Sequence, residues 1–282
     1  MVKILITGDL CPIGRNLSAF RKGDIGNLYR DLLPVFKNSD YSVATLECPL
    51  IRSKTPIEKV GPVLGAPEET VAGIRGAGID ALNLANNHIL DHGIAGLKNT
   101  MEICRKNGIV YFGAGRNLAE ARNILVREIG GIRVGLLGMG EHEFNIAGKD
   151  SPGANPLDPI DFVRNVAENR DRFDYLIVFL HAGNEYYPYP RPSLQKICRF
   201  LIEEGAGAVI CQHTHVPGGA EPYRDGHIVY GQGNFIFDLD RPEPDWHRGV
   251  LVELEIEGPG KSRIKLIPYL QSDGMPGARK MD

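Results

Sequence analysis

The sequence lacks the marks of several protein classes. Its five cysteines are an odd number and form no Cys-x-x-Cys pair, which argues against a disulfide framework or a zinc ribbon. No stretch approaches the roughly 18 consecutive apolar residues of a membrane-spanning helix. The formal net charge is −3, and no long block of like charge offers a surface for nucleic acid or an anionic membrane. We therefore expect reduced thiols, no nucleic-acid partner and no membrane insertion by this chain.

The first residues also lack the pattern of a secretory signal peptide. The apolar run that begins at Val2 is only a few residues long and ends at Asp9. A signal peptide has a longer apolar core, of about 7–15 residues, behind a basic start. We therefore expect the protein to be cytoplasmic.

The overall composition is that of a globular protein. Apolar residues make up 43% and charged residues 24% of the 282 residues, so apolar material for a sizeable core is present. No internal repeat, low-complexity segment or shift in composition marks a domain boundary. The sequence predicts a single domain over residues 1–282.

Strand-length apolar runs alternate with amphipathic, helix-length stretches. In residues 191–204, for example, Leu194, Ile197, Leu201 and neighbouring apolar residues follow helical spacing. The predicted strands are residues 3–7, 42–46, 81–84, 110–112, 124–129, 133–138, 175–180, 208–211, 228–230, 249–256 and 263–269. The predicted helices are residues 25–36, 67–76, 93–107, 159–172 and 191–204. Strands separated by helices indicate β-α-β units and an α/β fold.

The C-terminal third has a different pattern. Residues 221–230, with Arg224-Asp225-Gly226 at the centre, predict a β-hairpin that two more strands follow. This mixture favours a layered α/β/β/α sandwich over a simple doubly wound sheet. Residues 141–159 are rich in Gly, Pro, Asn and Asp, and they predict a long loop over one face that could act as a lid.

Metal-capable side chains repeatedly follow the apolar strands. The carboxyl ends of parallel strands meet at one edge of a sheet, so these side chains can converge there. Carboxylate, amide and imidazole donors suit manganese, zinc, iron or nickel. Six ligands are too many for one ion and fit two divalent ions about 3.5–4 Å apart, with Glu47 as the best candidate for a bridge. The candidate ligands are Asp9, Glu47, Asn87, His181, His213 and His215.

Each of these patterns also has an ordinary structural explanation. A lone histidine after a strand is more often structural, His-x-His arises by chance, and an Asp after Gly often forms a turn or a helix cap. The joint pattern favours the metal site, because five of the eight histidines lie in these strand-end motifs. We interpret the other three, His142, His227 and His247, as surface or loop residues.

Six short motifs occur in a fixed order between about residues 3 and 240. They are Gly-Asp, Leu-Glu-x-Pro, Asn-Asn-His-x-x-Asp-x-Gly, His-x-Gly-x-Glu-Tyr, His-x-His-Val and Gly-Asn-Phe-x-Phe-Asp. Each is weak alone, but together they resemble the CapA family of poly-γ-glutamate capsule proteins. That family is similar to the calcineurin-like metallophosphoesterases, so the resemblance implies a four-layer α/β/β/α sandwich with a dinuclear metal site.

The resemblance also implies roles for individual residues. His88 matches the residue that contacts the scissile phosphate and can act as an acid, and Asp91 could orient it. Carried over by position, the metal ligands are Asp9 and His215 for one ion, Glu47 as the bridge, and Asn87, His181 and His213 for the other.

The sequence departs from the superfamily pattern at Cys11, where the first motif usually has a histidine. Either Cys11 binds metal as a thiolate, or one ion is a ligand short. Glu185, Tyr186 and Asn234 could support the ligands or contact substrate, although packing and a turn explain them equally well. Arg191 precedes a proline at a predicted helix start, where it could meet an anionic substrate or remain a solvated surface residue.

Three functions fit these observations. The first is a metal-dependent hydrolase, of phosphoesterase type, acting on an anionic small molecule or polymer with two divalent ions (Mn, Zn or Fe). The second is an accessory protein or hydrolase that acts on poly-γ-glutamate during capsule polymer synthesis or release. The third is a binding module with a metal-free site, for which Cys11 is the only support.

Overall fold

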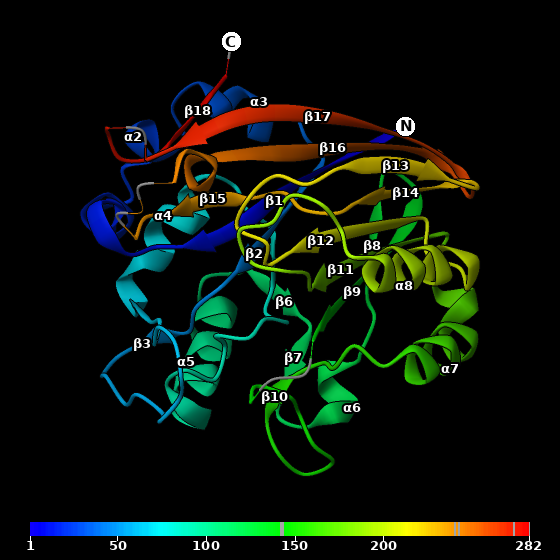
Figure 1. Ribbon diagram of the computed structural model, residues 1–282, viewed down its shortest axis with the longest axis horizontal. Coiled ribbons are helices and arrows are strands. Elements are labelled where there is room, and N and C mark those ends of the chain that lie inside the picture. Colours follow the sequence, from blue (N-terminus) through cyan, green and yellow to red (C-terminus); the bar gives the residue numbers. More distant parts are fainter. Residues whose placement is uncertain (142–143, 240, 242, 273, 282) are drawn as a thin grey trace.

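The computed structural model describes residues 1–141, 144–239, 241, 243–272 and 274–281. Within these residues, one sheet of eight strands and another of six lie face to face, and helices cover their outer faces. Figure 1 shows helices on both flanks of the stacked strands.

The first sheet combines a parallel half with an antiparallel half. Its parallel strands are β1 (Val2–Cys11), β2 (Tyr41–Leu46), β5 (Ala81–Asn83), β6 (Val110–Phe112) and the short β15 (Asn234–Phe237), which pairs with the end of β1. Its antiparallel strands are β16 (Arg248–Gly258), β17 (Lys261–Gln271) and β18 (Ala278–Lys280). The parallel half therefore directs several carboxyl ends to one edge.

The second sheet is parallel at its centre and has antiparallel edges. Its order is β13 (Ala220–Tyr223), β14 (Gly226–Val229), β12 (Ala208–Gln212), β11 (Tyr175–His181), β9 (Ile132–Gly140) and β8 (Leu125–Ile129). Strands β14, β12, β11 and β9 are parallel, and β13 and β14 form the hairpin predicted around Arg224-Asp225-Gly226.

The helices form the outer layers. The first sheet is covered by α1 (Leu17–Lys22), α2 (Ile25–Tyr29), α3 (Leu33–Lys37), α4 (Val71–Gly76) and α5 (Gly93–Lys106). The second sheet is covered by α7 (Pro159–Asn169) and α8 (Pro192–Glu203), and the short α6 (Leu118–Ala121) precedes β8. Figure 1 shows α4 and α5 on one flank and α7 and α8 on the other. Among the helices of the described segments, none combines the length and apolar content needed to cross a membrane.

The four layers follow from a two-residue alternation along the strands. In β1, Leu5 packs into the core beneath the helices, while Ile4 and Ile6 pack into the core between the sheets. In β11, Leu176 faces α7 and α8, and Ile177 faces the other sheet. Both sheets therefore bury both faces, and the predicted α/β/β/α sandwich is confirmed.

Several elements differ from the prediction for local reasons. The helix predicted at residues 25–36 is interrupted by a 3₁₀ turn at Arg30–Leu32, because Arg30 has a φ of 44° and Pro34 begins a new helix. Helix α1 and strand β18 were not predicted. At β15 the sequence predicted only that a strand ends nearby, because these four residues directly follow a glycine-rich turn.

The predicted loop at residues 141–159 is fixed to the sheet in its described part. A short ladder and a side-chain hydrogen bond hold it: β10 (Gly153–Ala154) pairs with β7 (Ala114–Gly115), and Asn145 Nδ2 donates to Asn86 O at 2.6 Å. The described part thus does not form a free lid over the sheet edge. His142, expected to be a surface or loop residue, lies outside the described residues.

Gly8 of β1 lies directly against the backbone of Gly233, the residue before β15. A Cβ atom added to Gly8 would lie 1.9 Å from the Gly233 carbonyl oxygen, which is fixed backbone. We expect Gly8→Ala to lower the free energy of unfolding by about 1–3 kcal/mol through overpacking. Gly258→Ala is the matched control, because a Cβ there meets no atom within 4 Å. Urea unfolding of both variants tests this, and equal stabilities would contradict the close approach.

Candidate metal centre

The strand ends of both sheets meet at one rim of the sandwich and bring the predicted ligands together. In the first sheet, Asp9 lies near the end of β1, Glu47 directly follows β2, and Asn87 lies just beyond β5. In the second sheet, His181 ends β11, and the His-x-His motif directly follows β12. All six side chains are buried. The predicted convergence therefore occurs across the two sheets rather than along a single edge.

Glu47 lies at the middle of this cluster. Its Oε1 atom is 3.3 Å from His181 Nε2 and 3.7 Å from His215 Nε2. His181 Nε2 is also 3.0 Å from Asn87 Oδ1, and His181 Nδ1 is 3.7 Å from Asp9 Oδ1. Two acid–imidazole groups share the Glu47 carboxylate, each with its ligand atoms within 4.8 Å of one another: Glu47, His181 and His213, and Asp9, Glu47 and His215.

The donor atoms of this cluster have unmet bonding capacity. In the described part of the chain, Asp9 Oδ1, both carboxylate oxygens of Glu47, His181 Nδ1 and His213 Nδ1 are buried without a hydrogen-bond partner. Buried polar atoms are nearly always paired, because leaving them unpaired costs free energy. Carboxylate oxygens and imidazole nitrogens are also the donors that first-row divalent ions accept. The residues therefore fit divalent cations.

Burial determines the charge states of the cluster in the absence of a cation. It raises the pKa of Asp9 to about 7, against the opposing hydrogen bond from the His213 amide. Burial and the charge of Asp9 raise the pKa of Glu47 well above its usual range. Burial also lowers the pKa of His213 to about 4 and that of His215 to about 3. The imidazoles are therefore neutral, the form that binds metal.

The backbone around the His-x-His motif is strained. Among the described residues, six non-glycine residues have positive φ, and three of these are at the cluster: Tyr186 (61°), His213 (91°) and His215 (58°). Such conformations cost on the order of 1–3 kcal/mol each and concentrate at functional sites. The amide of His213 donates to Asp9 Oδ2 at 2.9 Å, which fixes the motif against β1.

Asn234 holds the orientation of one ligand. Its Oδ1 atom lies 2.9 Å from His215 Nδ1, and its Nδ2 donates to the His215 carbonyl at 3.3 Å. If Nδ1 carries the proton for this bond, Nε2 is left as the donor atom that faces Glu47. Asn234 is fully buried, so the structure favours ligand support over the predicted substrate contact.

His88 and Asp91 form the predicted pair. His88 Nδ1 lies 2.7 Å from Asp91 Oδ2, and Asn86 Oδ1 accepts a bond from the His88 amide at 3.0 Å. Asp91 Oδ2 also accepts from the Leu64 amide at 2.7 Å. Asn86 and Asp91 thus fix both the backbone and the ring of His88.

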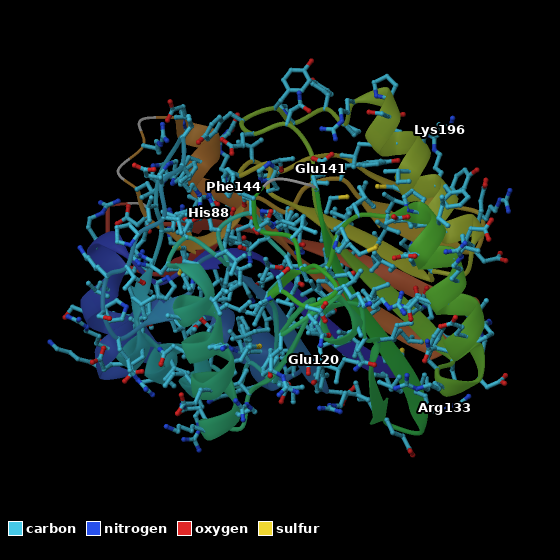
Figure 2. The ribbon with its side chains drawn as sticks, turned by 90° about the horizontal axis from the view of Figure 1, so that it is seen from below. His88, Glu120, Arg133, Glu141, Phe144 and Lys196 are labelled. Atoms are coloured by element: carbon cyan, nitrogen blue, oxygen red, sulfur yellow. The ribbon has the colours of Figure 1, made fainter. Side chains whose placement is uncertain are left out.

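Lys59 contacts both residues of this pair, and no sequence pattern predicted it. Its Nζ atom lies 2.6 Å from Asp91 Oδ1 and 3.2 Å from His88 Nδ1, and its side chain is only 3% exposed. Nζ also lies 4.8 Å from the centre of the Phe144 ring, and Figure 2 shows Phe144 and His88 at the same rim. Lys59 lies in an irregular loop far from any strand end, so no local pattern indicated its role.

The structure does not bring Cys11 into the cluster. The register of the β1–β15 pairing shifts between Asp9 and Leu10, and Cys11 packs into the core beneath the helices beside Cys48. Burial raises the pKa of the Cys11 thiol well above its usual range, which disfavours the thiolate that a metal needs. A sequence pattern could not reveal this one-residue irregularity.

The remaining predicted contacts lie at the mouth of the cluster. Glu185 forms a third metal-capable group with His213 and His215, and it is exposed. The Tyr186 ring is half exposed and lies 5.9 Å from the His215 ring. Arg191 is committed to protein partners, because it pairs with Glu141 and donates to Asn184 Oδ1 at 2.8 Å and Ser193 Oγ at 3.1 Å.

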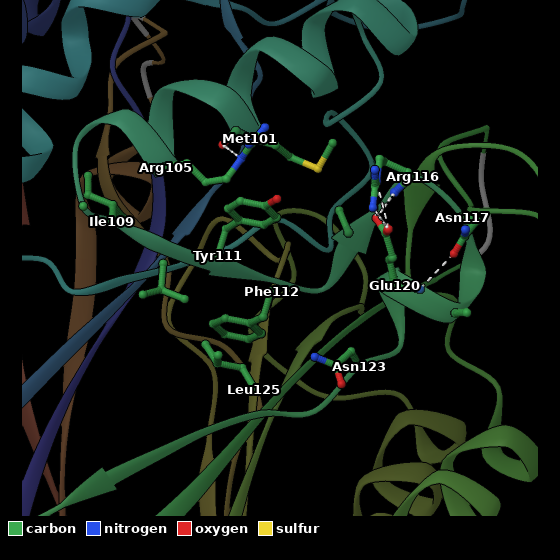
Figure 3. Close-up of a pocket in the computed structure, with 14 residues that line it drawn as sticks. Met101, Arg105, Ile109, Tyr111, Phe112, Arg116, Asn117, Glu120, Asn123 and Leu125 are labelled. Carbon is green, nitrogen blue, oxygen red and sulfur yellow. Dashed lines mark hydrogen bonds and ion pairs between the residues drawn. The ribbon is translucent and has the colours of Figure 1, made fainter.

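A separate cavity of about 880 Å³ lies between α5, β6, α6 and β8, away from the cluster. Figure 3 shows it lined by Tyr111, Phe112 and Leu125 together with the Arg116–Glu120 ion pair. It contains none of the candidate ligands, and the two charges of its ion pair satisfy each other. This cavity is therefore not part of the candidate metal centre.

Glu47 is the carboxylate common to both ligand groups. We expect Glu47→Gln to lower the bound metal per chain by at least half, because an amide offers one neutral oxygen in place of a carboxylate. Glu128→Gln, on the exposed face of β8, is the control that should retain the wild-type content. Elemental analysis after loading with Mn²⁺ or Zn²⁺ measures this, and an unchanged content would count against a bridging role.

Lys59 and Asp91 form a buried ion pair. We expect Lys59→Met to lower the free energy of unfolding by about 3–5 kcal/mol, because the Asp91 charge stays buried without its partner. The double variant Lys59→Met/Asp91→Asn should recover part of that loss. Lys54→Met, an exposed residue of the same loop, should change stability little. Urea unfolding of wild type and the three variants tests the coupling, which a double variant no more stable than Lys59→Met would exclude.

A known protein is similar in sequence to most of this chain. The chain is 31% identical over 261 residues to the capsule biosynthesis protein CapA of Bacillus anthracis, covering 88% of this chain but 62% of that protein. It thus spans less than two thirds of that relative's length.

Solved structures share the fold. A hypothetical protein from Thermus thermophilus matches with a TM-score of 0.60 and 18% identity, over 95% of this chain and 99% of that one. A 5'-nucleotidase from Candida albicans matches with a TM-score of 0.51 and 11% identity, over 94% and 51%. The resemblance predicted from the six motifs is confirmed, because the model of the family described as bacterial capsule synthesis protein PGA_cap matches residues 3–239. The chain belongs to this family of capsule synthesis proteins.

Proposed function

We propose that this protein is a metal-dependent hydrolase of phosphoesterase type. The observation that carries the proposal is the pair of ligand groups that share Glu47 beside the His88–Asp91 pair. Two divalent ions held there would act as Lewis acids and lower the pKa of bound water to about 7. The ligands for them would be those implied by the motifs, without Cys11. The fold shared with a 5'-nucleotidase supports the same reaction class at the level of architecture.

The residues of the chain have distinct tasks in this reaction. Asp91 holds His88 through Nδ1, which leaves His88 Nε2 as the atom that can exchange a proton with the leaving oxygen. Lys59 and the Leu64 amide each donate a hydrogen bond to the Asp91 carboxylate and so hold it in place beside the imidazole. Asn234 keeps His215 turned toward the centre. The chain thus supplies orientation and one proton-transfer group.

A second candidate function is hydrolysis or handling of poly-γ-glutamate at the same centre. It is favoured by membership of the capsule synthesis family and by the relative named as a capsule biosynthesis protein. Both candidates require an anionic substrate, either a small molecule or a polymer. They differ in the bond that is attacked, which is a phosphate ester in one and an amide in the other.

Activity of the metal-loaded protein tests both candidates. We expect protein stripped with a chelator and reloaded with Mn²⁺ or Zn²⁺ to hydrolyse p-nitrophenyl phosphate or its diester, and the stripped protein to be inactive. We expect His88→Ala to lower kcat about 10²–10⁴-fold through loss of proton transfer, without loss of bound metal. His227→Ala is the control, because His227 lies at the start of β14, where its Nε2 is 3.1 Å from the Ser262 carbonyl oxygen.

A panel of γ-glutamyl oligomers assayed with the same protein separates the candidates. Cleavage of the oligomers without cleavage of the phosphate esters would replace the first proposal by the second. If no compound of either class is hydrolysed by protein that holds metal, the enzymatic proposal is wrong. Equal activity of His88→Ala and wild type would remove His88 from the reaction.

A further inference from the structure

Arg241 lies at the mouth of the metal centre, between β15 and β16. Its guanidinium carbon is 5.5 Å from the centre of the Tyr186 ring and 5.7 Å from the centre of the Trp246 ring. The two rings lie 6.0 Å apart, and Trp246 is buried with its Nε1 donating to the Phe237 carbonyl at 3.1 Å. Arg241 is therefore packed against a fixed aromatic surface.

The same two rings contact a candidate metal ligand. The His215 ring lies 5.9 Å from the Tyr186 ring and 5.1 Å from the Trp246 ring. The Tyr186 and Trp246 rings thus lie close to both the Arg241 guanidinium and the His215 ring. A group held by Arg241 would therefore belong to the same molecule as a group at the metal ions, or to its immediate neighbour.

The N–H donors of the Arg241 guanidinium are available to a ligand. Within the described residues, no acid lies within ion-pair distance of its guanidinium, whereas Arg191 and Lys59 are each paired with a carboxylate. Stacking on aromatic rings uses the flat face of a guanidinium and leaves its N–H donors free in the plane. A planar fork of this kind matches the two oxygens of a carboxylate or phosphate.

The backbone of Arg241 is held in place as well. His247 Nε2 lies 3.0 Å from the Arg241 carbonyl oxygen, and His247 Nδ1 lies 3.2 Å from the Gln271 carbonyl oxygen. This histidine ties the residue to the end of β17. A cation placed in advance by backbone and ring contacts loses little freedom when it binds an anion.

We propose that Arg241, backed by Tyr186 and Trp246, forms an anion-binding subsite beside the metal centre. It would take a carboxylate or phosphate group of the substrate that is not the group under attack. The inference rests on the proposed function, since it assigns a specificity-determining contact to the same site. A substrate with two anionic groups would then be preferred over one with a single group.

Trp246 is the only tryptophan of the chain, so its fluorescence reports on this subsite directly. We would titrate the metal-loaded and the metal-stripped protein with inorganic phosphate and, separately, with γ-glutamylglutamate. Wild type should show a saturable change in fluorescence with at least one probe in both forms. Arg241→Gln should weaken that binding about tenfold or more, as expected for loss of a charge-assisted bidentate contact, and Arg241→Lys should weaken it less.

Arg224→Gln is the matched control, because Arg224, in the turn between β13 and β14, pairs with Glu203 of α8. It should bind both probes as wild type does. If Arg241→Gln fails to fold, intermediate binding by Arg241→Lys carries the test, with calorimetry as an independent measure. Weakening with one probe alone supports the subsite and names its ligand as phosphate or carboxylate.

Unchanged affinity of the Arg241 variants for both probes would overturn the subsite, as would absence of saturable binding to wild type by fluorescence and calorimetry. No turnover is needed for these titrations. Loss of hydrolysis with anion binding retained would therefore count against the proposed reaction and leave the subsite standing.

Discussion

The structure depends on one constraint: the carboxylate of Glu47 is fully buried between two imidazoles and has no hydrogen-bond donor in the described residues. A buried carboxylate is stable only if it is paired, protonated or bound to a cation. Its neighbours cannot pair with it, because burial keeps the imidazoles of His181 and His215 neutral and Asp9 adds a like charge. The fold thus holds the Glu47 carboxylate where only a proton or a bound cation can stabilise it.

Holding such groups together requires support from outside the cluster. The His213 amide binds Asp9, Asn234 binds His215, and the Asn86 side chain fixes both the end of β2 and the start of the His88 turn. These contacts join strands of both sheets, so the cluster depends on the sandwich being complete. The positive φ angles of the His-x-His motif show that packing elsewhere offsets local backbone strain.

The positions of the candidate ligands could be predicted from the sequence better than their surroundings could. Asp9, Glu47 and His181 were found because each lies at the carboxyl end of a strand, a position that parallel topology fixes. Lys59 and Arg241 were not found, since each lies in an irregular loop whose path depends on tertiary contacts. The position of Cys11 could not be predicted either, because it depends on how β1 pairs with β15, and the register of that pairing shifts between Asp9 and Leu10.

The net charge of the centre would depend on the bound ions. The floor carries Asp9 and Glu47, and two divalent ions would bring four positive charges against these two negative ones. At the rim, Lys59 is neutralised by Asp91, and an aromatic pair holds the Arg241 cation toward the opening. A loaded centre would therefore present a net positive field to solvent. Because low-dielectric walls strengthen such a field, it would attract an anionic substrate and repel a cationic one before any specific contact forms.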